Sequence, residues 1–159
     1  MTEALYALVL KNMSSTVDEL ARYVPKPKSV PFADSVAYRY VEKTPRQAII
    51  QKLASYVTTL RAACLLSEHG FVQEQAALQR MLDEIREDVT FLACGLMTGA
   101  LTPLHETYLA AFYQEEFDPA TGKPGDQNRP MPQRKKIRAY MASVVGGTSD
   151  PSSGLEATR

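Results

Sequence analysis

The stretch "TPRQAIIQKLASYVTTLRAACLLSEHGFVQEQAALQRMLDEIREDVTFL" (residues 44–92) decides the fold. Thr44 and Pro45 have the chemistry of an N-cap followed by a first helical residue, because proline lacks the N–H that this position leaves unpaired. Gly70 can adopt the left-handed conformation that follows a helix end. The sequence therefore predicts one long helix over 45–69.

Apolar residues recur every three or four positions on both sides of that glycine, as expected for helices that pack through one face. The first stripe comprises Ile50, Leu53, Val57, Leu60 and Cys64. The second stripe comprises Leu78, Leu82, Ile85, Val89, Leu92 and Leu96. Because only a short turn separates them, helices over 45–69 and 71–98 are expected to pack as an antiparallel hairpin.

Two further helices are predicted over 103–117 and 132–145, and a long loop rich in Gly and Pro, "DPATGKPGDQNRPMPQ", separates them. The expected fold class is all-α, a hairpin of two long helices within a four- to six-helix bundle whose core spans 44–147.

The predictions for the two ends of the chain are less regular. Residues 1–43 are expected to hold a short helix in "SSTVDELARYV" and a proline-rich connection, followed by "ADSVAYRYVEK" as a short helix or a simple lead-in. Residues 148–159 are read either as a disordered tail or as the start of a helix in a natural chain that continues past Arg159.

Bulk composition narrows the class of protein. The chain has 159 residues, with eighteen Lys plus Arg against eighteen Asp plus Glu. Zero net charge argues against a surface devoted wholly to nucleic acid, although a local basic patch is compatible with it. Two cysteines without a CxxC pair favour a reducing compartment. No signal peptide or spanning segment is recognisable, so we expect a cytoplasmic protein without a membrane partner.

No motif for metal or nucleophilic chemistry is complete. "HETYL" supplies His105 and Glu106 of a zinc-binding H-E-x-x-H helix, but Leu109 occupies the position of the second histidine. Cys64 and Cys94 lie among apolar residues, which suits core packing better than a reactive thiolate. The sequence therefore predicts neither a metal site nor a cofactor.

Basic residues gather in "RPMPQRKKIR", which contributes the nucleic-acid-binding candidates Arg129, Arg134, Lys135, Lys136 and Arg138. Arg134 and Arg138 would share one helix face, close to a tyrosine able to stack on a base. The alternative is a solvated helix face that balances the acidic "QEEFD" upstream.

A polar line runs beside the second apolar stripe. Arg80 and Glu84 are i,i+4 neighbours, and Asp88 follows one turn later. They are interpreted either as a surface ion pair or as a partly buried pair that reaches Arg61 or Glu68 on the preceding helix. In the second case Arg80, Glu84 and Arg61 become candidates for fixing the hairpin register or binding a polar ligand.

The stretch from Tyr56 to Phe91 resembles bacterial helical proteins that carry a hairpin with a glycine turn and an R-x-x-x-E step, here Arg80 and Glu84. The resemblance covers about a quarter of the chain. It implies a relation in broad style to HEPN-like helical bundles of abortive-infection and toxin–antitoxin systems. HEPN ribonucleases have Arg four to six residues before His, a spacing missing here, so the resemblance implies the scaffold without the nuclease.

Two functions are compatible with these observations. The first is a non-catalytic interaction or regulatory protein that binds a protein partner or self-associates through a face of the hairpin. The second is a HEPN-like, RNA-directed enzyme or RNA-binding component of a bacterial defence or toxin–antitoxin system, using the basic segment over 129–138.

Overall fold

The computed structural model describes residues 2–114 and 132–147, so the predicted tail over 148–159 and most of the predicted loop lie outside the described residues. The described residues are mostly helical, which confirms the all-α class in its coarse form, but they also include a two-stranded sheet. The helices are α1 (Thr2–Ala21), α2 (Pro45–Glu68), α3 (Val72–Met97), α4 (Pro103–Phe112) and α5 (Arg134–Gly147), and the strands are β1 (Lys28–Phe32) and β2 (Ser35–Arg39).

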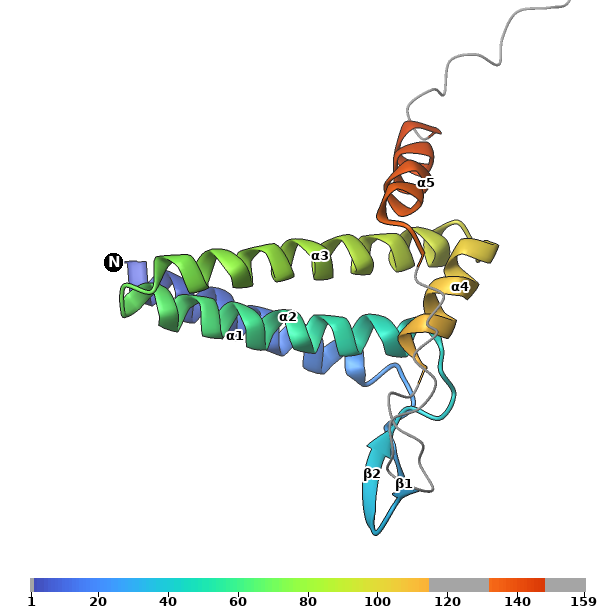
Figure 1. The fold of residues 1–159 in the computed structure, drawn as a ribbon, viewed down its shortest axis with the longest axis horizontal. Coiled ribbons are helices and arrows are strands. Elements are labelled where there is room, and N and C mark those ends of the chain that lie inside the picture. Colours follow the sequence, from blue (N-terminus) through green and yellow to red (C-terminus); the bar gives the residue numbers. More distant parts are fainter. Residues whose placement is uncertain (1, 115–131, 148–159) are drawn as a thin grey trace, which may run out of the picture.

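The three long helices form an elongated layer. Helices α2 and α3 lie side by side and run in opposite directions, and α1 runs along α2 with its N-terminus near the turn that joins α2 to α3 (Figure 1). Helix α4 crosses the other end of this layer (Figure 1). From that end α5 extends to one side and the β-strands extend to the opposite side. We call the end where α4, α5 and the strands lie the crowded end. The opposite end, which holds the α2–α3 turn and the start of α1, we call the sparse end.

The start of α2 is held by a capping box. The backbone N–H of Gln47 donates to Thr44 Oγ1 at 3.2 Å, and the N–H of Thr44 donates to Gln47 Oε1 at 3.1 Å. The buried Gln47 side chain also donates to Glu42 at 2.9 Å. Tyr113, just after α4, donates its hydroxyl hydrogen to the Thr44 carbonyl at 2.7 Å, which ties α4 to this helix start.

The structure corrects two details of the N-terminal region. The helix expected over 14–24 is the second half of a longer helix, which begins at Thr2 and ends at Ala21. Residues 33–43 contain β2, which excludes the short helix and leaves the alternative of a lead-in to α2. Strands β1 and β2 pair in an antiparallel register around a two-residue turn in which Ala33 has a φ of 48°. The strands were not predicted because each has only five residues, too few for a clear alternating pattern. Their hydrogen bonds form between the two strands and not within one segment.

The small sheet is anchored to the helices by an ion pair. Lys28 Nζ lies 2.7 Å from a carboxylate oxygen of Glu42, whose other oxygen accepts the hydrogen bond from Gln47. These two hydrogen bonds lower the pKa of Glu42 to about 2. The carboxylate is therefore ionised at neutral pH and can hold strand and helix start together.

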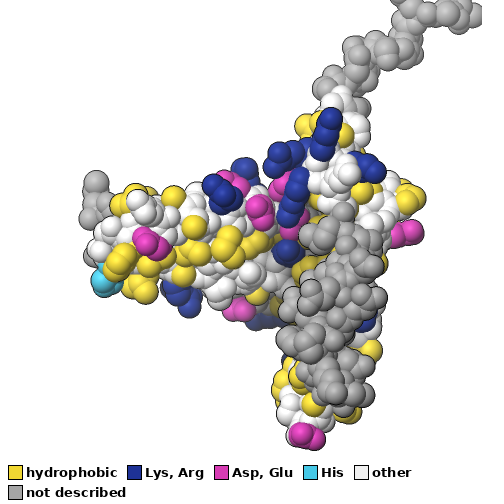
Figure 2. Space-filling view, viewed as in Figure 1, with side chains coloured by type: hydrophobic (Ala, Val, Ile, Leu, Met, Phe, Trp, Pro, Cys, Tyr) yellow, Lys and Arg dark blue, Asp and Glu magenta, His cyan; other side chains and the backbone are white. Residues whose placement is uncertain are grey.

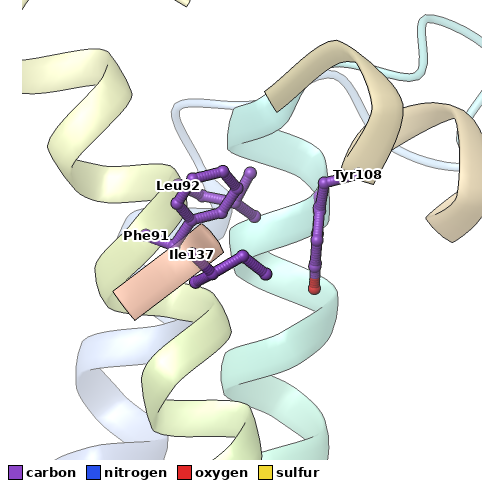
Figure 3. Packing of buried hydrophobic residues seen from close by; sticks show 5 residues of the cluster. Phe91, Leu92, Tyr108 and Ile137 are labelled. Atoms are coloured by element: carbon purple, nitrogen blue, oxygen red, sulfur yellow. The ribbon is translucent and has the colours of Figure 1, made fainter. Parts of the chain in front are cut away.

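The main apolar cluster lies at the crowded end. It contains Ala48 of α2, Phe91 and Leu92 of α3, Tyr108 of α4 and Ile137 of α5. Figure 3 shows the α3, α4 and α5 members converging beside α2. The aromatic ring of Phe91 has no exposed surface, so burial of this cluster is the main apolar contribution that joins four helices.

A buried histidine sits against the cluster. The His105 ring stacks on Phe91, with ring centroids 4.0 Å apart and an angle of 2° between the planes. Its Nδ1 accepts from the Thr102 N–H at 3.2 Å, and its Nε2 lies 3.1 Å from the Phe91 carbonyl oxygen. Because Nδ1 is an acceptor, Nε2 carries the hydrogen that is donated to that carbonyl. Burial lowers the pKa of His105, so the neutral ring is the form that the fold accommodates.

Gly95 makes room for this ring. A Cβ atom at Gly95 would lie 2.6 Å from His105 Nε2, closer than real contacts allow. We therefore expect Gly95→Ala to lower the free energy of unfolding by about 1–3 kcal/mol, because overpacking exceeds the helix propensity gained from alanine. Chemical denaturation measures the change. Gly146→Ala is the control, since the space around its Cβ is open. A Gly95→Ala protein as stable as wild type would contradict this role.

The lowered pKa of His105 predicts a pH dependence of stability. The unfolded chain binds a proton near its ordinary pKa of 6.5, whereas the folded protein resists protonation, so this contribution to stability is complete above about pH 6.5. It is lost as the pH falls toward the lower pKa of the folded state. We expect the free energy of unfolding to decrease by at most about 1.4 kcal/mol per pH unit in that range.

His69, the other histidine of the chain, provides the control for that measurement, because it is exposed at the α2–α3 turn. Denaturation of His69→Gln should show the same pH dependence as wild type. If the stability of His69→Gln no longer changed between pH 7 and pH 5.5, roughly the range in which histidine titrates, the pH dependence would come from His69. That outcome would contradict its assignment to His105.

Candidate functional site

A buried carboxylate lies at the junction of the helices. Asp88 of α3 is only 2% exposed. Its Oδ2 lies 2.8 Å from Lys52 Nζ of α2, and its Oδ1 accepts a hydrogen bond from Arg134 of α5. One carboxylate thus pairs with cations from two other helices.

A second carboxylate extends this network toward solvent. Glu87 accepts from Arg138 Nε and lies 3.4 Å from Arg134 Nη1. Its side chain is 14% exposed, whereas that of Arg138 is 68% exposed. We call the five residues Lys52, Glu87, Asp88, Arg134 and Arg138 the Asp88 cluster. The inner pairs are more shielded from salt than the outer pair.

The surroundings of the cluster raise the pKa of Arg134 and of the neighbouring Tyr108. Burial of Arg134 disfavours its positive charge, but the hydrogen bond to Asp88 and the charges of Asp88, Glu87 and Glu84 outweigh it and raise the pKa. Burial, followed by the negative charge of Asp88, raises the pKa of Tyr108 far above its ordinary value. The arginine therefore stays charged and the phenol stays protonated, so the cluster offers oriented donors to a bound group.

The predicted polar line separates into buried and exposed parts. Arg80 and Glu84 are exposed, and no ion pair joins them within the described part of the chain. Both line an open depression of about 750 Å³ that also includes Arg138. Arg61 is exposed on α2. The third member of the line, Asp88, is the residue that the fold buries.

The basic residues predicted to bind nucleic acid differ in their contacts and exposure. Arg134 and Arg138 pair with carboxylates of α3, Lys135 and Lys136 are exposed, and Arg129 lies outside the described residues. Figure 2 shows basic and acidic side chains intermixed where α5 meets α3. This junction is therefore a surface of mixed charge.

Lys52 and Glu87 were missed as site residues in the sequence. A usable signal was present, because Asp88 lies three residues after Ile85 and four before Leu92, at the edge of the apolar stripe. A charged residue in such a position requires an opposite charge from a facing element. The identity of that partner could not be read from the sequence, since Arg134 is 46 positions away.

A second feature is the exposure of apolar side chains at the sparse end. None of the residues 5–21 of α1 is buried, and Leu5 is 59% exposed. The side that faces the protein is half-buried and comprises Leu10, Met13, Ser14, Val17 and Ala21. A different side, which we call the outer face of α1, comprises the exposed residues Leu5, Val9, Asn12, Thr16 and Leu20. Figure 2 shows further hydrophobic side chains on the α2–α3 layer, where Leu65, Phe71, Val72 and Met81 are exposed.

Comparisons with known proteins identify no relative: no family model matches the chain, and neither a curated protein nor a solved structure matches it. Among the described helices, none combines the length and the apolar character needed to cross a membrane. Within residues 2–114 and 132–147, no three His, Cys, Asp or Glu side chains come together as a possible metal site.

The Asp88 cluster predicts unequal effects for two neighbouring acidic residues of α3. Asp88→Asn leaves Lys52 and Arg134 beside a neutral amide, and we expect it to lower the free energy of unfolding by about 2 kcal/mol, since both cations are partly exposed. The exposed Glu84→Gln should change it by no more than a few tenths of a kcal/mol. Urea denaturation of both variants measures the difference. Equal effects would show that Asp88 does not hold the helices together.

Proposed function

We propose that the protein is a helical interaction protein that self-associates through the outer face of α1. The observation that carries the proposal is the exposure of Leu5, Val9 and Leu20 along one side of a twenty-residue helix. Exposed apolar side chains that share one side of a helix, as Leu5 and Val9 do, are a usual mark of a protein–protein contact. The helix uses its other side to pack on α2, so the outer face is available to a partner.

A second copy of the chain is the occupant that fits this face best. Residues 4–10 contain no charged side chain, so an uncharged surface matches this part of α1. If two α1 helices pack in opposite directions about the midpoint of Asn12 and Met13, Leu5 of one copy lies opposite Leu20 of the other. Val9 then lies opposite Thr16, and the pattern is complementary to itself, as a twofold interface requires.

Self-association through α1 would bring α1, α2 and α3 of each copy into one helical bundle. The sequence favoured a face of the hairpin as the interface. We prefer α1 because its described side chains include none that is buried, whereas α2 and α3 already bury residues against each other and against α4 and α5.

The RNA-directed alternative has weaker support. Its basic segment is partly engaged, since Arg134 and Arg138 pair with Asp88 and Glu87. A strand of phosphates would need to compete with these carboxylates for the same guanidinium groups. Self-association is therefore the better supported of the two functions.

Sedimentation equilibrium tests the proposal. We expect wild-type protein to form a dimer whose dissociation depends on concentration, and Leu5→Ser combined with Val9→Ser to be monomeric with unchanged helicity by circular dichroism. Tyr38→Ser is the matched control, because it removes a side chain that is 74% exposed on β2. A wild-type monomer at every concentration would overturn self-association.

Cross-linking tests the arrangement of the two helices. In a Cys64→Ser background, Asn12→Cys should be cross-linked between copies by a short bismaleimide, because Asn12 lies near the twofold axis. Lys11→Cys is the control, since this exposed neighbour points to a different side of the same helix. Equal cross-linking of the two variants would contradict the antiparallel arrangement even if a dimer forms.

A further inference from the structure

A cavity of about 290 Å³ lies beside the Asp88 cluster, between α2, α3, α4 and α5. Lys52, Asp88 and Arg134 form its polar side. Phe112 and Ile137 contribute apolar walls, together with the small side chain of Ala111. A concave apolar space with a few convergent polar groups is the usual form of a site for a small molecule.

The Asp88 cluster beside this cavity has an excess of positive charge. Lys52, Arg134 and Arg138 carry three positive charges, and Asp88 and Glu87 carry two negative charges, which leaves one positive charge. Lys52 and Arg134 also retain donor capacity. An ammonium group has three hydrogens and a guanidinium group has five, and the described residues provide Lys52 with Asp88 as its ion-pair partner. A ligand carboxylate could therefore accept from both without displacing Asp88.

The apolar side indicates what the rest of the ligand must be. The Lys52 ammonium lies 5.3 Å from the centroid of the Phe112 ring, so the cation and the aromatic wall are close neighbours. A flat apolar body placed against Phe112 would keep an attached carboxylate within reach of the ammonium. Ile137, which is 1% exposed, forms the cavity wall on α5.

We propose that this cavity binds a small organic monocarboxylate with an apolar, preferably aromatic, body. The carboxylate accepts hydrogen bonds from Lys52 and Arg134, and the body packs against Phe112 and Ile137. A monoanion matches the single excess positive charge, whereas a dianion such as phosphate would meet the carboxylate of Asp88 with uncompensated charge. This site is independent of the outer face of α1, which lies on another helix.

Isothermal titration calorimetry with benzoate tests the proposal. Wild-type protein should bind benzoate, and should bind the isosteric neutral amide benzamide and inorganic phosphate at least about tenfold more weakly, because each lacks either the charge or the apolar body. Absence of benzoate binding over its soluble range would overturn the proposal. Equal affinity for benzoate and benzamide would also overturn it, since the cations would then play no part.

Variants locate the bound benzoate. Lys52→Met should weaken benzoate binding by roughly tenfold or more, and Lys136→Met, which removes an exposed lysine of α5, should leave it unchanged. Lys52→Met also removes a partner of Asp88, so a second variant that alters no charge is needed. Ala111→Leu fills the cavity, and we expect it to abolish binding while the protein remains folded by circular dichroism. Unchanged affinity in both Lys52→Met and Ala111→Leu would place benzoate elsewhere and overturn the proposal.

Discussion

The buried carboxylate of Asp88 is the constraint on which the crowded end of the molecule depends. An ionised group without water is stable only when opposite charges and donors surround it, and here α2 supplies Lys52 and α5 supplies Arg134. Helix α5 buries only Ile137 among its described side chains. Its position therefore depends more on the ion pairs with α3 than on apolar burial. Apolar burial brings the helices together, and the Asp88 cluster restricts the arrangement in which they can meet.

The same end concentrates the remaining buried polar contacts. His105 stacks on Phe91 and donates to its carbonyl, and Gly95 provides the space that the ring occupies. At the other end α1 contributes half-buried residues only, and several leucine and valine side chains remain in solvent. The two ends therefore differ in character. The crowded end holds the cavity beside the Asp88 cluster, and the sparse end leaves apolar side chains of α1 exposed.

Sequence patterns predicted the helices over 45–69 and 71–98 to within one or two residues of α2 and α3, because capping residues and a periodic apolar stripe act locally. They failed for β1 and β2, whose stability comes from pairing with each other and from the Lys28–Glu42 contact. They also placed the end of α4 five residues too late, since that helix ends at Phe112. Tyr113, in the turn that follows, reaches back to Thr44.

Only part of the candidate site could be predicted from the sequence. Asp88 could be recognised as a charge at the edge of an apolar stripe. Nothing in the sequence around Lys52 distinguishes it from a solvent-exposed lysine of a helix. What the sequence by itself determined is where α2, α3, α4 and α5 begin, to within two residues, and which sides of the two long helices α2 and α3 are apolar. These features depend on residues a few positions apart. Only the tertiary structure decided which charges meet, because Lys52, Asp88 and Arg134 become neighbours after three helices have packed. Their burial, and hence their chemistry, follows from that packing.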